Sequence, residues 1–352
     1  MKRVLLAGAG HAHAVVLASL ARSPLYGASV TLVSPRARQI YSGMLPGVIA
    51  GHYRESEATL DVAALAGRAY ADFVEDSVVA LDAAARSVTL ASGRKLSYDF
   101  LSLNVGSRVD ASLPGAAHHA VAVKPFDSLL ARLEGEQVKH VAIAGGGAAG
   151  VELAMALRHR GAEVTVYSER DAFTGSAARR VYRALRRRRV DYRPGMRADH
   201  VATGPVVYSG SSRQAFDLVL WASGAAPLDF FAASGLALDE QGYVRVDECL
   251  RSVSHPEVLA AGDCASLGEA KSGVHAVRQG RVLGDNLRCL VRELRPQPYV
   301  PQDKALLILT CGARYAIALR GAWSAEGRWV WWWKNWIDRR WLRNLFPPQR
   351  AS

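Results

Sequence analysis

The pattern with the clearest chemistry is a glycine-rich turn, Gly145-x-Gly147-x-x-Gly150, which follows the apolar run VAIA and opens a helix-forming segment. The first glycine permits the sharp bend and the second lets the backbone approach a pyrophosphate. The third lets the helix pack closely on the strand. Free N–H groups and the helix dipole also favour negative charge at this point. The turn therefore predicts a dinucleotide-binding site.

The strand after this helix ends in residues that bear on which nucleotide is bound. A carboxylate at that position normally accepts the ribose hydroxyls, but Ser168 stands there, followed by Glu169 and Arg170. Either Glu169 binds the ribose of NADH, or Ser168 and Arg170 hold the 2′-phosphate of NADPH. The sequence leaves both readings open, and for Arg170 also a plain solvated loop.

A second, less regular turn lies at the start of the chain. Gly8 and Gly10 are in place, but His13 occupies the third glycine position and Ser34 stands where the ribose-binding acid is usual. His13 and His11 are either structural histidines with satisfied hydrogen bonds or groups near the phosphate of a bound nucleotide. We assign Gly8, Gly10, His13 and Ser34 to cofactor binding.

Both turns are set in the same order of elements. Residues 2–8 are an apolar run that ends in glycine, residues 11–22 favour a helix, and residues 28–34 favour a strand. The order restarts at residue 139, and Gly145 follows Gly8 by 137 residues. Residues 73–103 differ, since short β-forming runs around Ser92-Gly93 indicate a meander. A repeated strand–helix–strand unit of this kind indicates two nucleotide-binding domains.

The predicted fold is thus α/β, with two Rossmann-type dinucleotide-binding domains, an inserted β-meander and a short C-terminal tail. We assign residues 1–115 and 250–300 to a discontinuous first domain and residues 116–249 to the second. Residues 301–352 form a C-terminal region with a β segment and an amphipathic helix.

Bulk composition narrows the classes of function. Of the 352 residues, 50% are hydrophobic and 22% are charged, as is usual for a globular protein. The net charge of +12 favours anionic partners, but no nucleic-acid-binding module is visible and we do not expect nucleic acid as a partner. The four cysteines form no close pair, so we expect a reduced compartment and no metal site. The first strand begins at once, which predicts a cytoplasmic protein without a leader.

The order of motifs resembles that of the FAD- and NAD(P)-dependent oxidoreductases with two dinucleotide-binding domains. This is the pyridine nucleotide-disulfide oxidoreductase superfamily, which includes type II NADH dehydrogenases and sulfide:quinone oxidoreductases. The chain is most similar to the subfamily that is also found fused to selenide, water dikinase. The matching segments are GAGHAHAVVL (8–17), YSGMLPGVIAGHY (41–53), LSYDFLSLNVGS (96–107), AIAGGGAAGVELA (142–154), WASGAAP (221–227), VLAAGDCA (258–265), VHAVRQGRVLGDNL (274–287) and VWWWKNWIDRRW (330–341).

The resemblance implies FAD in the first domain and NAD(P)H in the second. Gly8 and Gly10 are then expected to cradle the FAD pyrophosphate, and Asp263 to bind the ribityl or pyrophosphate region, with Gly262 allowing the chain to turn. Val78 is expected to touch the adenine. The segment from Tyr41 to Pro46 is expected to lie against the isoalloxazine ring, and Gly224 in WASGAAP is also assigned to cofactor binding.

The same resemblance suggests two catalytic residues. Glu152 corresponds to an acidic residue near the contact of nicotinamide and flavin, and Gln279 is expected to reach the pyrimidine side of the flavin. The alternatives are that Glu152 braces a helix and that Gln279 is only a packed polar residue. The expected activity is that of an FAD-dependent NAD(P)H dehydrogenase with a quinone as the electron acceptor. A soluble flavin reductase for a selenium or sulfur compound and a non-catalytic redox sensor are the alternatives.

The tail contributes a tryptophan-rich helix. One half of its helical projection holds most apolar residues, namely Trp329, Val330, Trp332, Trp333, Trp336, Ile337 and Trp341. The other half holds Lys334, Asn335, Asp338 and Arg339. We expect residues 329–346 to contact the cytoplasmic membrane face peripherally. The alternatives are packing on the protein's own body and a homodimer interface. Residues 179–189 carry seven arginines, which fit a solvated helix face, nucleotide steering or lipid contact.

Overall fold

The N-terminal apolar run is the middle strand of a five-stranded parallel sheet in the computed structural model, which describes all residues except 111, 135–137, 223, 303 and 347–352. From Val4 to Ala7 the strand is buried on both faces, as is usual for a parallel sheet covered by helices. The sheet order is β21 (Val258–Ala260), β9 (Phe100–Leu103), β1 (Lys2–Ala7), β2 (Ala28–Ser34) and β5 (Ala71–Glu75).

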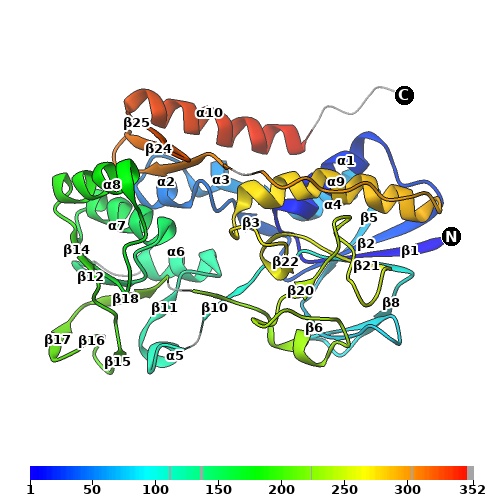
Figure 1. The fold of residues 1–352 in the computed structure, drawn as a ribbon, viewed down its shortest axis with the longest axis horizontal. Helices are drawn as coiled ribbons and strands as arrows, with labels where there is room; N and C mark the ends of the chain where they lie inside the picture. The colour runs from blue at the N-terminus through cyan, green and yellow to red at the C-terminus, as the bar shows by residue number, and fades with distance from the viewer. Residues whose placement is uncertain (111, 135–137, 223, 303, 347–352) are drawn as a thin grey trace.

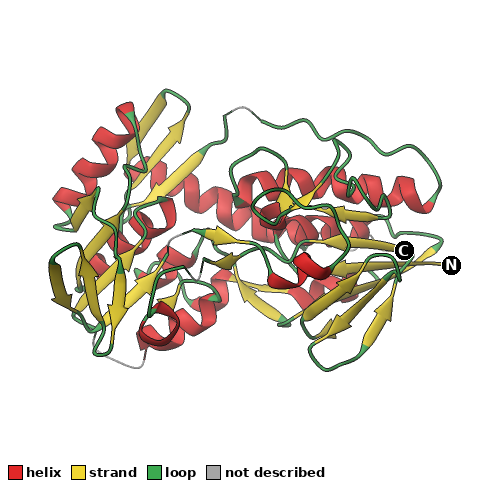
Figure 2. Ribbon diagram, turned by 60° about the horizontal axis from the view of Figure 1, so that its bottom comes forward, coloured by secondary structure: helices red, strands yellow, loops and turns green. Residues whose placement is uncertain are grey.

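A second five-stranded parallel sheet repeats this arrangement. Its order is β11 (Val121–Ala122), β18 (Leu218–Trp221), β12 (His140–Ala144), β13 (Glu163–Ser168) and β14 (Asp191–Pro194). Figure 2 shows the strands gathered in two groups, one toward each end of the molecule. The predicted α/β fold with two dinucleotide-binding units is confirmed.

In each unit, the helix that follows the glycine turn connects two neighbouring parallel strands. The helix α1 (His11–Arg22) joins β1 to β2, and α7 (Ala148–Arg160) joins β12 to β13. Figure 1 shows α1 beside α9 (Gly273–Val291), and these two helices are in direct contact. The other helices are α2 (Leu45–Ile49), α3 (Glu55–Ala58), α4 (Val62–Arg68), α5 (Ala116–His119), α6 (Phe126–Glu134) and α8 (Gly175–Arg187).

The smaller sheets are antiparallel, apart from one short pair. The meander contains β6 (Val78–Asp82), β7 (Ser87–Leu90) and β8 (Lys95–Ser97), and a similar sheet contains β15 (His200–Ala202), β16 (Val206–Ser209) and β17 (Ser212–Ala215). Two-stranded pairs are β3 (Arg38–Ile40) with β4 (Thr59–Asp61), β10 (Arg108–Val109) with β19 (Ala225–Ala226), and the parallel pair β20 (Val244–Arg245) with β22 (Ala265–Ser266).

Residues 229–246 pack with the first unit, although the sequence analysis placed them in the second. Phe231, Leu236 and Val244 share a buried cluster with Leu5 and Val33 of the first sheet. The segment lacks a strand in the second sheet because its apolar side chains fill the space beside the meander. We therefore propose that the second domain ends near residue 227 rather than at residue 249.

The C-terminal region spans both units. Its sheet contains β23 (Leu307–Thr310), β24 (Ala316–Arg320) and β25 (Trp323–Gly327), and the helix α10 (Arg328–Leu345) follows. Figure 1 shows α10 lying along one side of the molecule, above α2 and toward α1. The predicted region 301–352 includes residues 303 and 347–352, which lie outside the described residues. Within the described part of the chain, no helix is long and apolar enough to cross a membrane.

Candidate functional site

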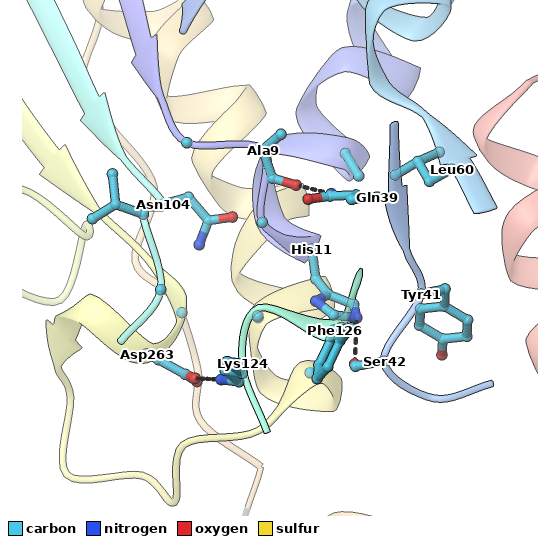
Figure 3. A pocket seen from close by; sticks show the side chains of 18 of the residues that line it. Ala9, His11, Gln39, Tyr41, Ser42, Leu60, Asn104, Lys124, Phe126 and Asp263 are labelled. Atoms are coloured by element: carbon cyan, nitrogen blue, oxygen red, sulfur yellow. Dashed lines mark hydrogen bonds and ion pairs between the residues drawn. The ribbon is translucent and has the colours of Figure 1, made fainter. Parts of the chain in front are cut away.

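A cavity of about 470 Å³ opens at the carboxyl ends of β1, β9 and β21. Parallel strands end at the same edge of a sheet, so the loops that follow them meet there. The side chains that line it come from both ends of the chain and from the segment that leads into the second unit (Figure 3). Those used below are Gly8, Gly10, His11, Ser34, Arg36, Tyr41, Asn104, Ser107, Lys124, Asp127, Gly262, Asp263 and Trp341.

The first glycine turn is built around Asn104, which follows β9. The φ of Gly8 is +83°, and a Cβ there would lie 2.5 Å from the Asn104 carbonyl oxygen. A Cβ on Gly10 would collide with the Asn104 side chain. Asn104 Oδ1 accepts hydrogen bonds from the N–H groups of Ala12 and His13 at 3.1 and 3.2 Å, so it caps the start of α1. Asn104 stands in the segment LSLNVGS, but its sequence gave no sign of this long-range cap.

His13 is completely buried and does not line the cavity. Its Nδ1 lies 2.5 Å from the Gly8 carbonyl oxygen and its Nε2 lies 2.8 Å from Ser102 Oγ. Burial lowers the pKa of the His13 imidazole to about 4, so the ring is neutral and both nitrogens are satisfied.

In the second turn a Cβ on Gly150 would collide with the Gly145 carbonyl oxygen. At the same position of the first turn, His13 makes a hydrogen bond with the Gly8 carbonyl oxygen. In the second turn the corresponding carbonyl, that of Gly145, leaves room only for the glycine at position 150.

Asp263 projects toward the cavity from the turn after β21 (Figure 3). It accepts a hydrogen bond from Ser107 Oγ at 3.2 Å, and Lys124 Nζ lies 3.3 Å from the same carboxylate. Gly262 has a φ of +73°, in the left-handed region that favours glycine. These two predicted residues both line the cavity.

An aromatic group forms another wall. The rings of Tyr41 and Trp341 stack with centroids 4.4 Å apart, and His11 lies 5.4 Å from each. Burial lowers the pKa of His11 to about 4, which keeps this imidazole neutral. Ser34 lines the cavity and donates its hydroxyl to the Arg36 carbonyl at 3.2 Å.

Besides His13, four of the residues predicted for the flavin site do not line this cavity. Pro46 is buried in α2, and Val78 pairs with Leu90 in the meander. Gly224 is exposed beside β19, with a φ of +65°. Gln279 is 3% exposed, and its two polar atoms bind Gly262 N–H and Glu269. Their predicted contacts with a cofactor remain predictions, and for Gln279 the geometry favours the packed-polar alternative.

The second glycine turn has the geometry of a nucleotide-binding turn. Gly145 has a φ of +126°, and Gly147 is the N-cap of α7. At the end of β13, Ser168 is buried and its hydroxyl donates to the Arg170 carbonyl at 2.6 Å. Glu169 is exposed, with Arg197 at 3.9 Å. The choice between NADH and NADPH therefore stays open, because both a carboxylate and arginines flank this strand end.

Glu152, on the first turns of α7, meets the C-terminal region. Its carboxylate accepts hydrogen bonds from the N–H and the hydroxyl of Thr310 at 2.8 and 2.9 Å. Burial raises the pKa of Glu152, and the charge of Lys334 opposes that rise. Lys334 Nζ donates to Asp338 Oδ2 and to the Gly43 carbonyl, each at 2.7 Å.

Tyr41 links this group to the cavity, since its hydroxyl donates to Asp338 Oδ1 at 3.2 Å. We call Glu152, Lys334, Asp338 and Tyr41 the buried charge cluster. It contains two carboxyl groups and one ammonium, and burial raises the pKa of Asp338 as well as that of Glu152. A buried group with one excess negative charge favours taking up a proton. The arrangement can therefore hold one proton beside the wall of the cavity.

The sequence-based assignment of faces on α10 was wrong in part. Lys334 and Asp338 are buried, at 8% and 4% exposure, although they were placed on the polar half. They are buried because each charge is paired with a partner inside the fold. The exposed side chains of α10 include Trp329, Trp332 and Trp336, each about half exposed.

Comparison with known proteins agrees with this geometry. The family model described as pyridine nucleotide-disulphide oxidoreductase matches residues 2–280. The chain belongs to the pyridine nucleotide-disulphide oxidoreductase family. Members of this family are oxidoreductases that bind FAD and NAD(P)H. The two glycine turns and the double α/β fold are thus those of the family.

Two proteins of known name are similar to this chain in sequence. A "NADH dehydrogenase-like protein" of Mycobacterium tuberculosis is 32% identical over 267 residues, which are 68% of this chain and 66% of the relative. "Ferroptosis suppressor protein 1" of Xenopus laevis is 26% identical over 259 residues, 67% of this chain and 68% of the relative. The chain therefore spans about two thirds of the length of these relatives.

Solved structures share the fold across nearly the whole chain. The sulfide:quinone oxidoreductase of Aquifex aeolicus has a TM-score of 0.81 at 16% identity, covering 98% of this chain and 91% of that one. NDH2 of Plasmodium falciparum, solved with NADH, has a TM-score of 0.79 at 15% identity, covering 98% and 97%. At this identity the likeness establishes the fold.

The four cysteines are unpaired and have no metal-binding partners among the described residues. Burial raises the pKa of the Cys264 thiol to about 11 and that of Cys311 to about 12. Both thiols are therefore protonated at neutral pH and are weak nucleophiles. Cys264 lies directly after Asp263, but its thiol points into the buried backbone, 3.3 Å from the Ala261 carbonyl oxygen.

Proposed function

We propose that this chain is an FAD-dependent NAD(P)H dehydrogenase that passes electrons to a quinone. The observation that carries the proposal is the buried charge cluster, which joins the helix of the second glycine turn to the wall of the first cavity through Glu152, Asp338 and Tyr41. Reduction of a quinone by NAD(P)H consumes one proton in addition to the hydride. A group that holds a proton between the two nucleotide sites suits this reaction.

The residues that line the cavity at the first glycine turn fit an FAD molecule. The turn at Gly8 and Gly10 has no side chains, so a pyrophosphate can approach the backbone at the start of α1. Ser34 and Arg36 line the end where an adenosine would lie, and Asp263 faces the middle of the cavity. When bound, FAD would accept a hydride and deliver electrons to a second substrate.

In the proposed reaction, the protein's side chains orient the bound molecules and supply the proton. Tyr41 and Trp341 form a rigid apolar wall that excludes water from one side of the cavity. Lys334 neutralises one of the two carboxyl groups, and the raised pKa of Glu152 and Asp338 keeps a proton available. Tyr41 would release its hydroxyl proton to the reduced acceptor and regain a proton from protonated Asp338, which lies within hydrogen-bonding distance.

The exposed tryptophans support a peripheral membrane contact through residues 329–346. Trp329, Trp332 and Trp336 point outward from α10, and Arg340 lies over the Trp336 ring at 5.1 Å. Indole rings settle at headgroup depth, and guanidinium groups pair with anionic lipid. Several exposed arginines of α8 carry further positive charge. A quinone dissolved in a bilayer would thus be near the enzyme that reduces it.

The experiment that tests the proposal is stopped-flow reduction of the purified flavoprotein by NADH and by NADPH, followed by a short-chain quinone. We expect one nucleotide to bleach the flavin rapidly and the quinone to reoxidise it rapidly. No bleaching by either nucleotide contradicts the dehydrogenase and leaves a redox sensor. Bleaching without reoxidation by quinone contradicts the acceptor, and turnover with selenium or sulfur compounds would then replace it.

A further inference from the structure

One peptide group in the wall of the cavity is held from both sides by buried side-chain amides. The carbonyl oxygen of Ala261 accepts a hydrogen bond from Asn104 Nδ2 at 2.7 Å. The N–H of Gly262 in the same peptide donates to Gln279 Oε1 at 2.6 Å. Asn104 and Gln279 are each 3% exposed and come from different elements, the end of β9 and the middle of α9.

Asn104 is anchored in turn at the start of α1. Its Oδ1 accepts from the N–H groups of Ala12 and His13, while its Nδ2 donates to Ala261. An amide oxygen can only accept and an amide nitrogen only donates, so these partners fix the orientation of the side chain. Asn104 therefore ties the first glycine turn to the turn that carries Asp263.

Gln279 is anchored on the far side of the same peptide. Its Nε2 donates to Glu269 at 3.1 Å, and the Tyr299 hydroxyl donates to the same carboxylate at 3.0 Å. The Glu269 side chain is 8% exposed, and His275 Nδ1 lies 3.7 Å from it. A buried network thus runs from α1 through the peptide to Tyr299, and such networks make side-chain orientations unique.

The peptide controls where the next residue points. Gly262 combines a φ of +73° with a position where a Cβ would lie 2.5 Å from Asn104 Nδ2, so the turn tolerates only glycine. Asp263 follows directly, with its carboxylate beside Ser107 and Lys124 in the cavity. A rotation of the 261–262 peptide plane would swing the Asp263 backbone and carry its carboxylate away from these partners.

We propose that Asn104 and Gln279 form a peptide clamp that sets the position of Asp263 toward the bound flavin nucleotide. The inference rests on the proposed function, because it takes the cavity as the FAD site. Both residues are positioning residues, since they act through the 261–262 peptide. The clamp also gives Gln279 a role that differs from the catalytic one predicted from the sequence.

Two isosteric variants test the clamp. Asn104→Asp keeps the acceptor for α1 and sets a carboxyl oxygen, in place of the amide donor, against the Ala261 carbonyl. Gln279→Glu keeps the acceptor for Gly262 but sets a second carboxyl group against Glu269, which pushes the clamp side chain away from its anchor. Each variant turns a buried hydrogen bond into a repulsive contact, so we expect the FAD dissociation constant to rise at least about tenfold. We also expect the flavin absorption bands and the reduction potential to shift, since the position of a charged group beside the flavin changes.

Asn286→Asp is the matched control. Asn286 is a buried amide on the same helix α9, and it donates to the carbonyls of Cys249 and Gln297 at 2.8 and 2.9 Å. It does not line the cavity. We expect this variant to lower the Tm as much as the clamp variants do, while FAD affinity and reduction potential stay at the wild-type values.

Three results would overturn the clamp. The first is a loss of Tm in Asn104→Asp and Gln279→Glu with FAD affinity and potential unchanged, as in the control. The second is full additivity of the two effects on FAD binding in the double variant, because two groups that hold one peptide must be coupled. If both variants fail to fold, Gln279→Met replaces them, since it removes the acceptor for the Gly262 N–H without adding a charge. We expect FAD binding to weaken about tenfold there, and no change is the third result. A wild-type protein without FAD instead refutes the proposed function.

Discussion

At the residue scale, buried histidine and carboxyl groups make the protein sensitive to pH. His13 is neutral in the folded state because it is completely buried between the Gly8 carbonyl and Ser102. Glu152 and Asp338 are buried with a single lysine between them. The first feature concerns stability and the second concerns proton supply, so they predict different measurements.

We expect the free energy of unfolding to fall as the pH drops below about 6.5. The pKa of His13 is about 4 in the folded protein against 6.5 for the free side chain, so the unfolded chain binds the extra proton. The loss from one such group is at most about 1.4 kcal/mol per pH unit between these two values. Urea denaturation at pH 7 and pH 5 measures it. His13→Asn should show a smaller difference between the two pH values, whereas the exposed His118→Asn should behave as wild type, and an unchanged slope in His13→Asn would refute the assignment.

We expect Glu152→Gln to slow quinone-dependent turnover on the order of a hundredfold, because general acid catalysis by a positioned group contributes that much or more. Flavin reduction by the nucleotide should change far less, since the hydride step needs no proton from this cluster. Stopped-flow measurement of the two half-reactions separates them. The control is Glu163→Gln on the exposed start of β13. Equal slowing of both half-reactions would mean that Glu152 only braces α7.

At the element scale, α10 has two faces with different tasks. The inner face carries Val330, Trp331, Lys334 and Asp338 into the fold, where the charges are paired. The outer face leaves three tryptophans about half exposed, and large exposed aromatic patches of this kind mark interaction surfaces.

We expect the triple variant with Trp329, Trp332 and Trp336 all changed to alanine to lose binding to vesicles of phosphatidylglycerol and phosphatidylcholine. Its turnover with a short-chain quinone in solution should stay at the wild-type level, because these side chains point away from the cavity. Sedimentation with vesicles gives the bound fraction. Trp331→Ala is the contrasting variant, since that buried ring should cost stability instead. Vesicle binding that survives the triple change would exclude the membrane role of this face.

At the scale of the whole molecule, the C-terminal region fastens the two nucleotide-binding units together. Thr310 bonds Glu152 of the second unit, while Arg339 bonds Glu57 of the first at 2.9 Å and Trp341 stacks on Tyr41. Arg36 of the first unit also forms an ion pair with Asp127 on α6. Figure 1 shows α10 reaching from one unit to the other. The region is therefore part of the site rather than an appendage.

We expect a chain that ends after residue 327 to retain little FAD and to have a much lower Tm. Without α10, Glu152 loses the charge of Lys334 and one aromatic wall of the cavity is missing, and an unpaired buried charge is strongly destabilising. The flavin-to-protein ratio and thermal unfolding measure both effects. A chain that ends after residue 346 is the control and should resemble the full protein. Full FAD content after loss of α10 would show that the helix serves only the surface.

Much of the architecture follows from short stretches of sequence. Gly145-x-Gly147-x-x-Gly150 lies between an apolar run and a helix, and its repeat near Gly8 predicted two similar units. Such patterns report local backbone geometry and the period of burial, which depend on residues close in sequence. Lys334 and Asp338, in the middle of α10, were assigned to the polar half because a helical projection weighs hydrophobicity alone. It does not show that the two charges neutralise each other inside the fold.

The contacts of the candidate site were decided by tertiary structure. Asn104 meets Ala261 across 157 residues, and Tyr41 meets Asp338 across 297. No periodicity or spacing links such pairs, because they are brought together only when the sheets, α9 and α10 pack. The sequence by itself determined the fold class, the glycine turns and the family resemblance. Which charged side chains lie beside the cavity, and which amides bond the backbone before Asp263, depends on the packing of elements that lie far apart in the chain.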